Sequence, residues 1–302
     1  MLKKNFNDLN DISNSDWISH LPVSLQPYIR LSRLDRPIGI WLMLLPCIGA
    51  LINANQNNVP KEKIFIFSLG TFLMRSIGCI INDICDQNFD KHVQRTRFRP
   101  LANGEIKINK VIIFLLIQLI LCGSFLIFVN NFTKFLAFLI LPVVFLYPIC
   151  KRFTYWPQLI LGICFNWGIL MAWCDTQNYI SNAAIFNWIG AISWQIGYDS
   201  IYAYVDAKDD RKLGIFSTAL LFKEKGKQWI AGFYFLAIIF WFFEGYIIKA
   251  NIGYYIMLFL ISLHLSFQIS LFNPNQASNN FNIFRSNIWI GLFLVAAAYF
   301  SN

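Results

Sequence analysis

Residues 64–90 read IFIFSLGTFLMRSIGCIINDICDQNFD, and this stretch decides the fold class. Its first part, residues 64–81, is mainly apolar and contains one charged residue, Arg75. A helix that crosses a bilayer needs about 20 mainly apolar residues. The second part brings Asp83, Asp86 and Asp90 together directly after the apolar run. The stretch therefore predicts a transmembrane helix that ends in a cluster of carboxylates at the membrane boundary.

Apolar runs of similar length recur along the rest of the chain. Of the 302 residues, 57% are hydrophobic and 14% are charged, a balance that a soluble protein with a large polar surface could hardly accommodate. The further candidate spans are residues 38–54, 111–129, 132–149, 159–174, 183–204, 229–248, 252–272 and 284–300. We expect an all-α integral membrane protein with about nine transmembrane helices, in which residues 38–302 form a single domain in the lipid bilayer.

Residues 1–37 are expected to form an N-terminal segment outside the spans. Its beginning is polar and mixed, with Pro22 and Pro27 further along, and it does not resemble a cleavable signal peptide. Between residues 17 and 33 the apolar side chains follow one helical stripe, which predicts an amphipathic helix on the membrane surface. An unstructured tail is the alternative. The stripe consists of Trp17, Leu21, Leu25 and Tyr28.

Basic residues are distributed unequally between the two sides of the predicted bundle. The net charge of +9 would suggest nucleic acid as the partner of a soluble protein, but in a membrane protein positive loops mark the cytoplasmic side. Only Lys61, Lys63, Lys134 and Lys249 fall on one side, and Arg75 lies within a span. The other 20 of the 25 Lys and Arg fall on the opposite side. We therefore expect no nucleic acid partner, a cytoplasmic N-terminus, and two long cytoplasmic connections after the second and sixth spans.

Polar residues recur on one face of each of two predicted helices. Seven of the 16 acidic residues lie at the ends of the second and sixth spans. Steps of four, three, four and four residues keep side chains on one helical face. On the second span this face would carry Arg75, Cys79, Asn82, Asp86 and Asp90. On the sixth span it would carry Gln195, Asp199, Tyr202, Asp206 and Asp210. We expect the chemistry of the protein at these two matching faces.

Several carboxylates on one helical face at a membrane boundary repel one another and need a cation. Mg²⁺ is the candidate, because it prefers oxygen ligands and uses a few carboxylates together with substrate phosphates. The Asn82 amide would add a neutral oxygen. In the alternative interpretation, the carboxylates pair with the basic residues of the two following connections. Two matched clusters on the same side favour a metal with a diphosphate, and nearby Arg and Lys would hold the phosphates.

The two acidic motifs, NDICDQNFD at 82–90 and DAKDD at 206–210, resemble the NDxxDxxxD and DxxxD motifs of the UbiA prenyltransferase family. The resemblance extends along nearly the whole chain, and is closest to the branch that acts on 4-hydroxybenzoate. It is carried by RLDRPIG at 33–39, RSIGC at 75–79, RTRFRPL at 95–101, YPICKR at 147–152 and GYDSIYA at 197–203. It implies a nine-helix fold with a central cavity, capped by the two cytoplasmic connections, in which Mg²⁺ holds a polyprenyl diphosphate in a bacterial inner membrane.

The resemblance also implies roles for individual residues. Asn82, Asp86 and Asp90 would bind one metal, Asp206 and Asp210 the other, with Asp86 and Asp206 essential for catalysis. Lys151 and Arg152 would contact the diphosphate, and Tyr147 would assist next to them. Arg33 would bind the acceptor's carboxylate, and Arg75, Asp199 and Tyr202 would also contact substrate. Phe216 departs from the family pattern, because related enzymes can carry Lys there.

The implied reaction is the transfer of a polyprenyl group to the ring carbon ortho to the hydroxyl of 4-hydroxybenzoate, with release of diphosphate, in ubiquinone biosynthesis. A sibling enzyme with another acceptor would share the metals and the fold. A transporter would place its polar residues near the middle of the bilayer, whereas these cluster at one boundary. A structural membrane protein would not need two matched acidic faces. The sequence predicts neither the prenyl chain length nor the oligomeric state.

Overall fold

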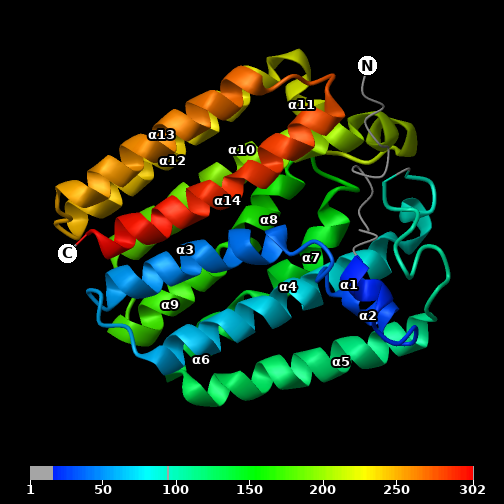
Figure 1. The fold of residues 1–302 in the computed structure, drawn as a ribbon, viewed down its shortest axis with the longest axis horizontal. Coiled ribbons are helices and arrows are strands. Elements are labelled where there is room, and N and C mark those ends of the chain that lie inside the picture. The colour runs from blue at the N-terminus through cyan, green and yellow to red at the C-terminus, as the bar shows by residue number, and fades with distance from the viewer. Residues whose placement is uncertain (1–15, 94, 302) are drawn as a thin grey trace.

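The structure is a computed structural model that describes residues 16–93 and 95–301. The described part of the chain contains helices and connections and no strand, so the predicted all-α fold is confirmed. The long helices lie side by side in one bundle (Figure 1). Residues 1–15 of the predicted N-terminal segment lie outside the described part.

Every predicted span falls on one helix or on two consecutive helices. Six spans are single helices: α3 (Ile38–Ala54), α4 (Lys61–Asp90), α10 (Asn182–Leu213), α12 (Gly226–Ile247), α13 (Ile252–Leu271) and α14 (Ala277–Tyr299). The others are α5 (Ile108–Ser124) with the 3-10 turn η2 (Phe125–Phe128), α6 (Asn131–Leu139) with α7 (Leu141–Cys150), and α8 (Pro157–Phe165) with α9 (Trp167–Gln177). By length and composition, seven helical segments of the described residues could cross a membrane, one of them Thr218–Ile247, which includes α12. α3 is a shorter apolar helix, and α10 is not among the seven, so the nine predicted spans are confirmed only approximately.

Two of the composite spans are interrupted for identifiable reasons. Pro142 stands in the first turn of α7, and because proline has no backbone N–H the preceding helix cannot continue through it. At the second interruption the Asn166 side chain donates hydrogen bonds to the Gly162 carbonyl and to Gln195 Oε1 at 2.8 Å. The sequence-based spans did not predict these two breaks.

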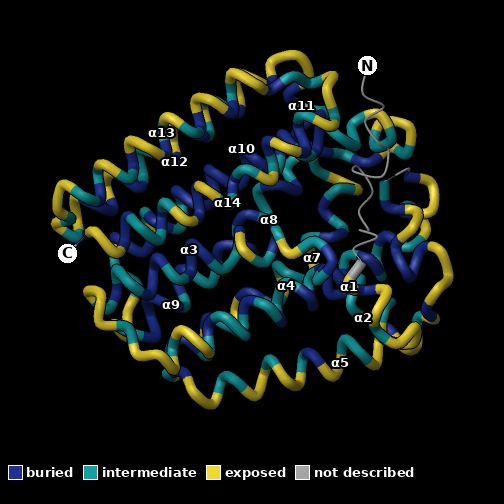
Figure 2. The backbone as a smooth tube through the Cα atoms, in the orientation of Figure 1, coloured by how far each residue is buried: buried dark blue, intermediate teal, exposed yellow. Residues whose placement is uncertain are grey.

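The interior of the bundle is formed around α10, which packs against α12, α14, α8 and α9. Trp194 of α10 and Trp241 of α12 are fully buried. The Trp194 indole N–H donates to Asn287 Oδ1 of α14 at 2.8 Å, which satisfies a polar group deep in the bundle. In contrast, the outer faces of α5 and α13 are exposed (Figure 2) and carry large apolar side chains such as Ile120 and Phe259. Because these surfaces are apolar, they fit hydrocarbon rather than water.

α4 and α10 are the two longest helices, and both extend past their apolar parts at the same end of the bundle. α10 ends at Gly214, whose φ of +68° closes the helix in the left-handed conformation that glycine adopts without strain. The chain then forms α11 (Thr218–Phe222) and the 3-10 turn η3 (Lys223–Lys225) before α12 begins. The connection predicted after the sixth span is therefore mostly helical.

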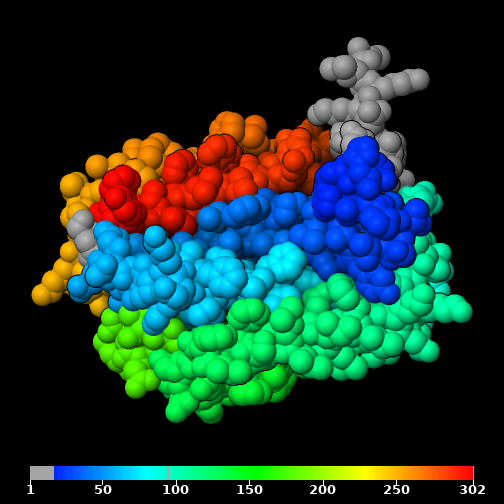
Figure 3. All heavy atoms as spheres, turned by 60° about the horizontal axis from the view of Figure 1, so that its bottom comes forward, coloured from blue at the N-terminus to red at the C-terminus, as the bar shows by residue number. Residues whose placement is uncertain are grey.

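The predicted amphipathic helix over residues 17–33 is replaced by two short helices, α1 (Asp16–Ser19) and α2 (Gln26–Leu31). A turn around Pro22 separates them, and Pro27 stands in the first turn of α2. α2 packs on α4, and Tyr28 makes an edge contact with Phe114 of α5, with ring centroids 4.9 Å apart. These helices cover one corner of the bundle (Figure 3). A location at the membrane surface remains a prediction.

Candidate active site

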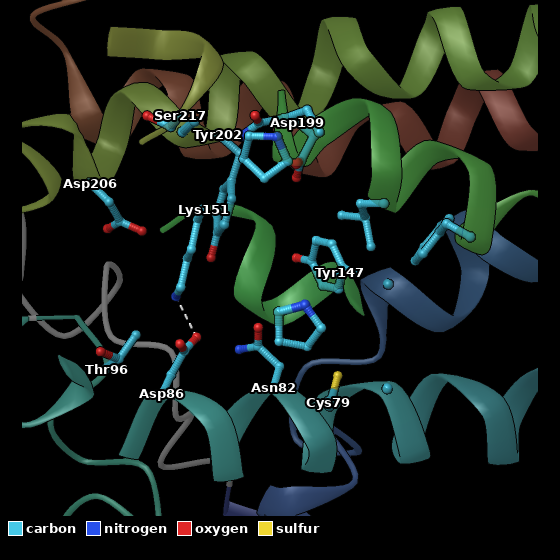
Figure 4. Close-up of a pocket in the computed structure, with 18 of the residues that line it drawn as sticks. Cys79, Asn82, Asp86, Thr96, Tyr147, Lys151, Asp199, Tyr202, Asp206 and Ser217 are labelled. Carbon is cyan, nitrogen blue, oxygen red and sulfur yellow. Dashed lines mark hydrogen bonds and ion pairs between the residues drawn. The ribbon is translucent and has the colours of Figure 1, made fainter. Parts of the chain in front are cut away.

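A cavity of about 320 Å³ lies between α4 and α10, at the end of the bundle to which both helices extend. Its walls come from α3, α4, α7, α8, α10 and α14 and from the connections after α4 and α10. Figure 4 shows Asn82 and Asp86 projecting from α4 toward Asp199, Tyr202 and Asp206 of α10. The two polar faces predicted from helical spacing therefore meet across one cavity.

Most of the predicted site residues line this cavity. They are Arg33, Arg75, Asn82, Asp86, Asp90, Tyr147, Lys151, Asp199, Tyr202, Asp206 and Asp210. Arg152 is the exception, because its exposed side chain lies outside the cavity lining. Its guanidinium donates to the backbone carbonyl of Cys85 and lies 5.2 Å from the centre of the Phe89 ring. Arg152 therefore packs against α4 while Lys151 enters the cavity.

Each acidic face is paired with a basic residue from another part of the chain. Lys151, which follows α7, forms an ion pair with Asp86 of α4 (Figure 4). Arg95, from the connection after α4, contacts both carboxylate oxygens of Asp206, with Nη2 2.7 Å from Oδ2 and Nε 2.9 Å from Oδ1. The same guanidinium lies 5.0 Å from the centre of the Tyr202 ring. Arg95 thus ties the connection directly to the acidic face of α10.

A second arginine of the same connection, Arg99, is buried between two carboxylates of α4. Its Nη1 lies 2.9 Å from Asp90 Oδ2 and 3.0 Å from Asp83 Oδ1. Asp83 also accepts a hydrogen bond from Arg33 Nη2 at 2.7 Å. This ion network of Arg33, Asp83, Arg99 and Asp90 joins the segment before α3, the helix α4 and the connection that follows it. Asp83 itself is not among the residues that line the cavity.

The ion network involves the backbone of Arg33 as well as its side chain. Arg33 has a φ of +57°, which is uncommon for a residue with a side chain. Its guanidinium donates to the Arg30 carbonyl as well as to Asp83. Arg33 borders the cavity, but its guanidinium is already engaged by a buried carboxylate.

Sequence spacing did not predict the roles of Arg95 and Arg99. Both lie in the RTRFRPL segment, which follows α4 and has no helical periodicity to show where a side chain points. The signal that could have found them is the density of basic residues directly after an acidic helix face. These ion pairs are what the alternative interpretation expected, in which the carboxylates pair with basic residues of the two connections. The carboxylates in these pairs include those assigned to a metal, so both interpretations involve the same side chains.

The donor set fits Mg²⁺ held jointly by protein and substrate. In the described part of the chain, no group of three or more His, Cys, Asp or Glu side chains is placed to hold a metal by itself. Mg²⁺ commonly uses only one or two carboxylates and completes its octahedron with water and substrate phosphates. Asp86 Oδ1 is buried and has no hydrogen-bond partner, although Lys151 contacts the other oxygen. Such an oxygen, next to the Asn82 amide, suits a cation in the cavity.

The carboxylates of α10 also favour a cation. Burial raises the pKa of the Asp210 carboxyl to about 7, and the neighbouring Asp206 carboxylate contributes to the same shift. A divalent ion between them would favour the ionised form of both groups. Asp206 and Asp210 are therefore suited to a second metal ligand pair across the cavity from Asp86.

Arg75 occupies the inner part of the cavity wall. Its Nε is buried without a hydrogen-bond partner, and its guanidinium lies 5.5 Å from the centre of the Phe165 ring. Among the residues that the structure describes, Arg75 forms no ion pair. Arg75 is therefore a half-buried cation without a contact ion pair among the described residues, and Asp199 in the same cavity is the carboxylate that its charge acts on.

Phe216 lies at the cavity rim, where the family pattern allows Lys. Its backbone N–H donates to the Lys151 carbonyl at 2.7 Å, and its ring lies 4.5 Å from that of Tyr155. The segment after α10 thereby holds the backbone of Lys151. The aromatic side chain at this position supports the wall and adds no charge.

Comparisons with known proteins agree with this geometry. The model of the UbiA prenyltransferase family matches residues 43–295. The chain belongs to the UbiA prenyltransferase family. Both acidic segments that face the cavity, residues 82–90 and 206–210, lie within the matched part of the chain.

Two curated relatives belong to the same branch of the family. The chain is 41% identical over 275 residues to a 4-hydroxybenzoate octaprenyltransferase of Francisella tularensis, covering 91% of this chain and 96% of that protein. It is 40% identical over 291 residues to a mitochondrial 4-hydroxybenzoate polyprenyltransferase of Dictyostelium discoideum. That match covers 93% of this chain and 62% of the Dictyostelium protein.

A solved structure of a family member shows the same fold. It is a UbiA homologue from Archaeoglobus fulgidus bound to GPP and Mg²⁺, with a TM-score of 0.69 and 16% sequence identity. The match covers 90% of this chain and 98% of the archaeal chain. The fold and the membrane-spanning helices together identify the protein as an integral membrane member of the UbiA family.

Proposed function

We propose that this protein transfers a polyprenyl group from polyprenyl diphosphate to the ring carbon ortho to the hydroxyl of 4-hydroxybenzoate, with Mg²⁺ as cofactor, in ubiquinone biosynthesis. The observation that carries the proposal is the meeting of two acidic helix faces and several cations in one cavity (Figure 4). The names of the Francisella and Dictyostelium relatives support the choice of acceptor.

The diphosphate is assigned to the outer part of the cavity, between α4 and α10. Asn82, Asp86 and Asp90 would hold one Mg²⁺, and Asp206 and Asp210 the other. When bound, Mg²⁺ supplies positive charge that stabilises the departing diphosphate. Lys151 and Arg95 lie beside these carboxylates and can donate charge-assisted hydrogen bonds to phosphate oxygens. Arg152 would act through its packing on α4, since its side chain lies outside the cavity lining.

In the reaction, the bond between the allylic carbon and the diphosphate oxygen breaks, and its electron pair leaves with the diphosphate. The ring carbon next to the phenol hydroxyl forms the new carbon–carbon bond, and loss of its proton restores aromaticity. The aromatic rings of Phe165, Tyr202, Phe281 and Phe284 line the cavity and can stabilise the positive charge on the allylic group. They also exclude water, which would otherwise trap that group.

The acceptor's carboxylate is assigned to Arg75. A carboxylate entering a poorly hydrated cavity needs a cationic partner, and Arg75 is a cation without an ion pair in the described structure. Arg33 already donates to Asp83, so we propose that it contributes mainly by holding the wall. Arg36, the third candidate, also lines the cavity without an ion pair to any described residue, and its guanidinium lies 5.6 Å from the centre of the Phe281 ring. Asp199, Tyr202 and Tyr147 line the cavity nearby and are proposed to contact the acceptor.

The orientation in the membrane is part of the proposal. The unequal distribution of Lys and Arg supports a cytoplasmic location for the acidic end of the bundle and the N-terminus. We propose a bacterial inner membrane as the location, in keeping with the similarity to the Francisella relative; the Dictyostelium relative is named as mitochondrial.

The test is product analysis with purified membranes that contain the protein. They are incubated with Mg²⁺, 4-hydroxybenzoate and diphosphates of several chain lengths, and the products are identified by mass. Parallel reactions use the acceptors of sibling enzymes. A prenylated 4-hydroxybenzoate that requires both Mg²⁺ and this chain is the expected product. Prenylation of another acceptor alone would refute the acceptor assignment, and no prenyl transfer to any acceptor would refute the enzyme assignment.

A further inference from the structure

Gly39, near the beginning of α3, is packed directly against the side chain of Arg75 on α4. A Cβ atom at position 39 would lie 2.6 Å from Arg75 Nε and 2.7 Å from Nη2. These distances are well below any real carbon–nitrogen contact, so the guanidinium occupies the space that a side chain would need. Both residues line the cavity.

The contact is specific to Arg75. The three atoms nearest to a Cβ at Gly39 all belong to the Arg75 guanidinium, and none belongs to a backbone. At Gly49, further along the same helix, the nearest atoms are instead backbone atoms of Leu294 on α14. The absence of a side chain at position 39 therefore does not serve close packing of two helix backbones. Gly39 is also inside a helix with ordinary φ, so conformational freedom is not its purpose.

Arg75 is held by packing, whereas four other cavity cations are held by ion pairs; Arg36, at the cavity wall, also lacks an ion pair with any described residue and lies 5.6 Å from the centre of the Phe281 ring. Arg33, Arg95, Arg99 and Lys151 each form an ion pair with an aspartate. The Arg75 guanidinium instead occupies the space next to Gly39 where a side chain would lie, and it lies over the Phe165 ring. Contacts of this kind fix the position of the group without using its hydrogen-bond donors in an ion pair. Asp199 acts on Arg75 only through charge across the cavity, so the guanidinium can still donate to an anionic substrate group.

We propose that Gly39 is a positioning residue for the acceptor: it lets the Arg75 guanidinium lie against α3, where it faces the carboxylate of the aromatic substrate. The inference rests on the proposed function, because it takes that carboxylate as the partner of Arg75. Any side chain at position 39 would displace the guanidinium and weaken the selection for acceptors that carry a carboxylate.

The experiment compares Gly39→Ala with Gly70→Ala in full-length protein in membranes. Gly70 lies in α4 outside the cavity lining, and a Cβ there would meet nothing within 4 Å. Alanine favours the helix at both positions, so a weakened α3 would not explain a loss. We measure KM for 4-hydroxybenzoate, KM for the prenyl diphosphate, and the ratio of kcat/KM for 4-hydroxybenzoate to that for its neutral amide.

In Gly39→Ala we expect KM for 4-hydroxybenzoate to rise by about fivefold or more. The preference for the acid over the amide should fall by a similar factor. KM for the diphosphate should stay within about twofold. Gly70→Ala should match the unchanged protein. In an Arg75→Lys background, the added Gly39→Ala should change nothing further, because the guanidinium it displaces is gone. This double variant also serves if Gly39→Ala alone does not accumulate.

Three results would overturn the inference. One is a Gly39→Ala protein that behaves like Gly70→Ala, another is equal loss of affinity for both substrates, and the third is a further loss in the Arg75→Lys background. If the unchanged protein does not prenylate 4-hydroxybenzoate at all, the proposed function fails instead. The two failures are therefore distinguishable.

Discussion

Replacement of Arg99 by Met should destabilise the protein strongly, because Arg99 is a buried cation shared by two buried carboxylates. Its side chain is 9% exposed, and those of Asp83 and Asp90 are 1% and 7% exposed. Met has a similar length and no charge, so the change removes the ion pairs and keeps most of the packing volume.

The magnitude follows from what each carboxylate retains. Removing one partner of a buried ion pair typically costs about 3–5 kcal/mol, since the other charge is left without compensation. Asp83 keeps its contact with Arg33, whereas Asp90 loses the ion pair that Arg99 provides. We therefore expect the lower end of that range, about 3 kcal/mol in the free energy of unfolding.

The matched control is Arg97→Met in the same connection. Arg97 is exposed and lies 4.7 Å from the centre of the Phe98 ring, and it forms no ion pair with any described residue. Surface substitutions of this kind usually change stability by no more than about 0.5 kcal/mol. Both variants are compared in detergent by thermal and denaturant unfolding. Adding Asp83→Asn to each background then measures the coupling between the two side chains.

Equal stability of the Arg99→Met and Arg97→Met variants would refute the reasoning, because the buried network would then contribute nothing. Additive effects of Arg99→Met and Asp83→Asn would show that the two groups do not interact. A coupling of more than about 1 kcal/mol is the expected outcome for two buried groups in contact.

Three further predictions concern the site and the topology. Asp86→Ala and Asp206→Ala should each reduce turnover at least about 100-fold while the protein still inserts and folds. Excess chelator should abolish activity until Mg²⁺ is restored, and full turnover in chelator would refute the role of the metal. Arg75→Lys should raise KM for 4-hydroxybenzoate roughly tenfold, since one charged hydrogen bond is worth about 1.5–3 kcal/mol, and an equal rise for the diphosphate would contradict the acceptor assignment. A cysteine at Asn103 should be labelled from the cytoplasm and one at Asn57 from the other side, and the reverse pattern would invert the topology.

The sequence by itself determined the class of the protein and the two acidic helix faces. Asn82, Asp86, Asp206 and Asp210 could be assigned to inward faces because residues three and four apart lie together on any helix, whatever surrounds it. The positions of the apolar helices were equally predictable, since an apolar run of about 20 residues has few alternatives to crossing a bilayer. Both are local properties of the chain.

Tertiary structure decided which charges meet. Arg95 and Arg99 lie in a connection without helical periodicity, and their partners on α10 and α4 depend on how that connection folds back over the bundle. Arg33 was expected to face substrate, yet its guanidinium donates to Asp83 from a distant part of the chain. The position of the Arg75 guanidinium depends on Gly39 of α3, which leaves space for it, and on the Phe165 ring of α8, over which it lies. Spacing along a helix shows which way a side chain points, but its partner depends on long-range packing, which no local pattern encodes.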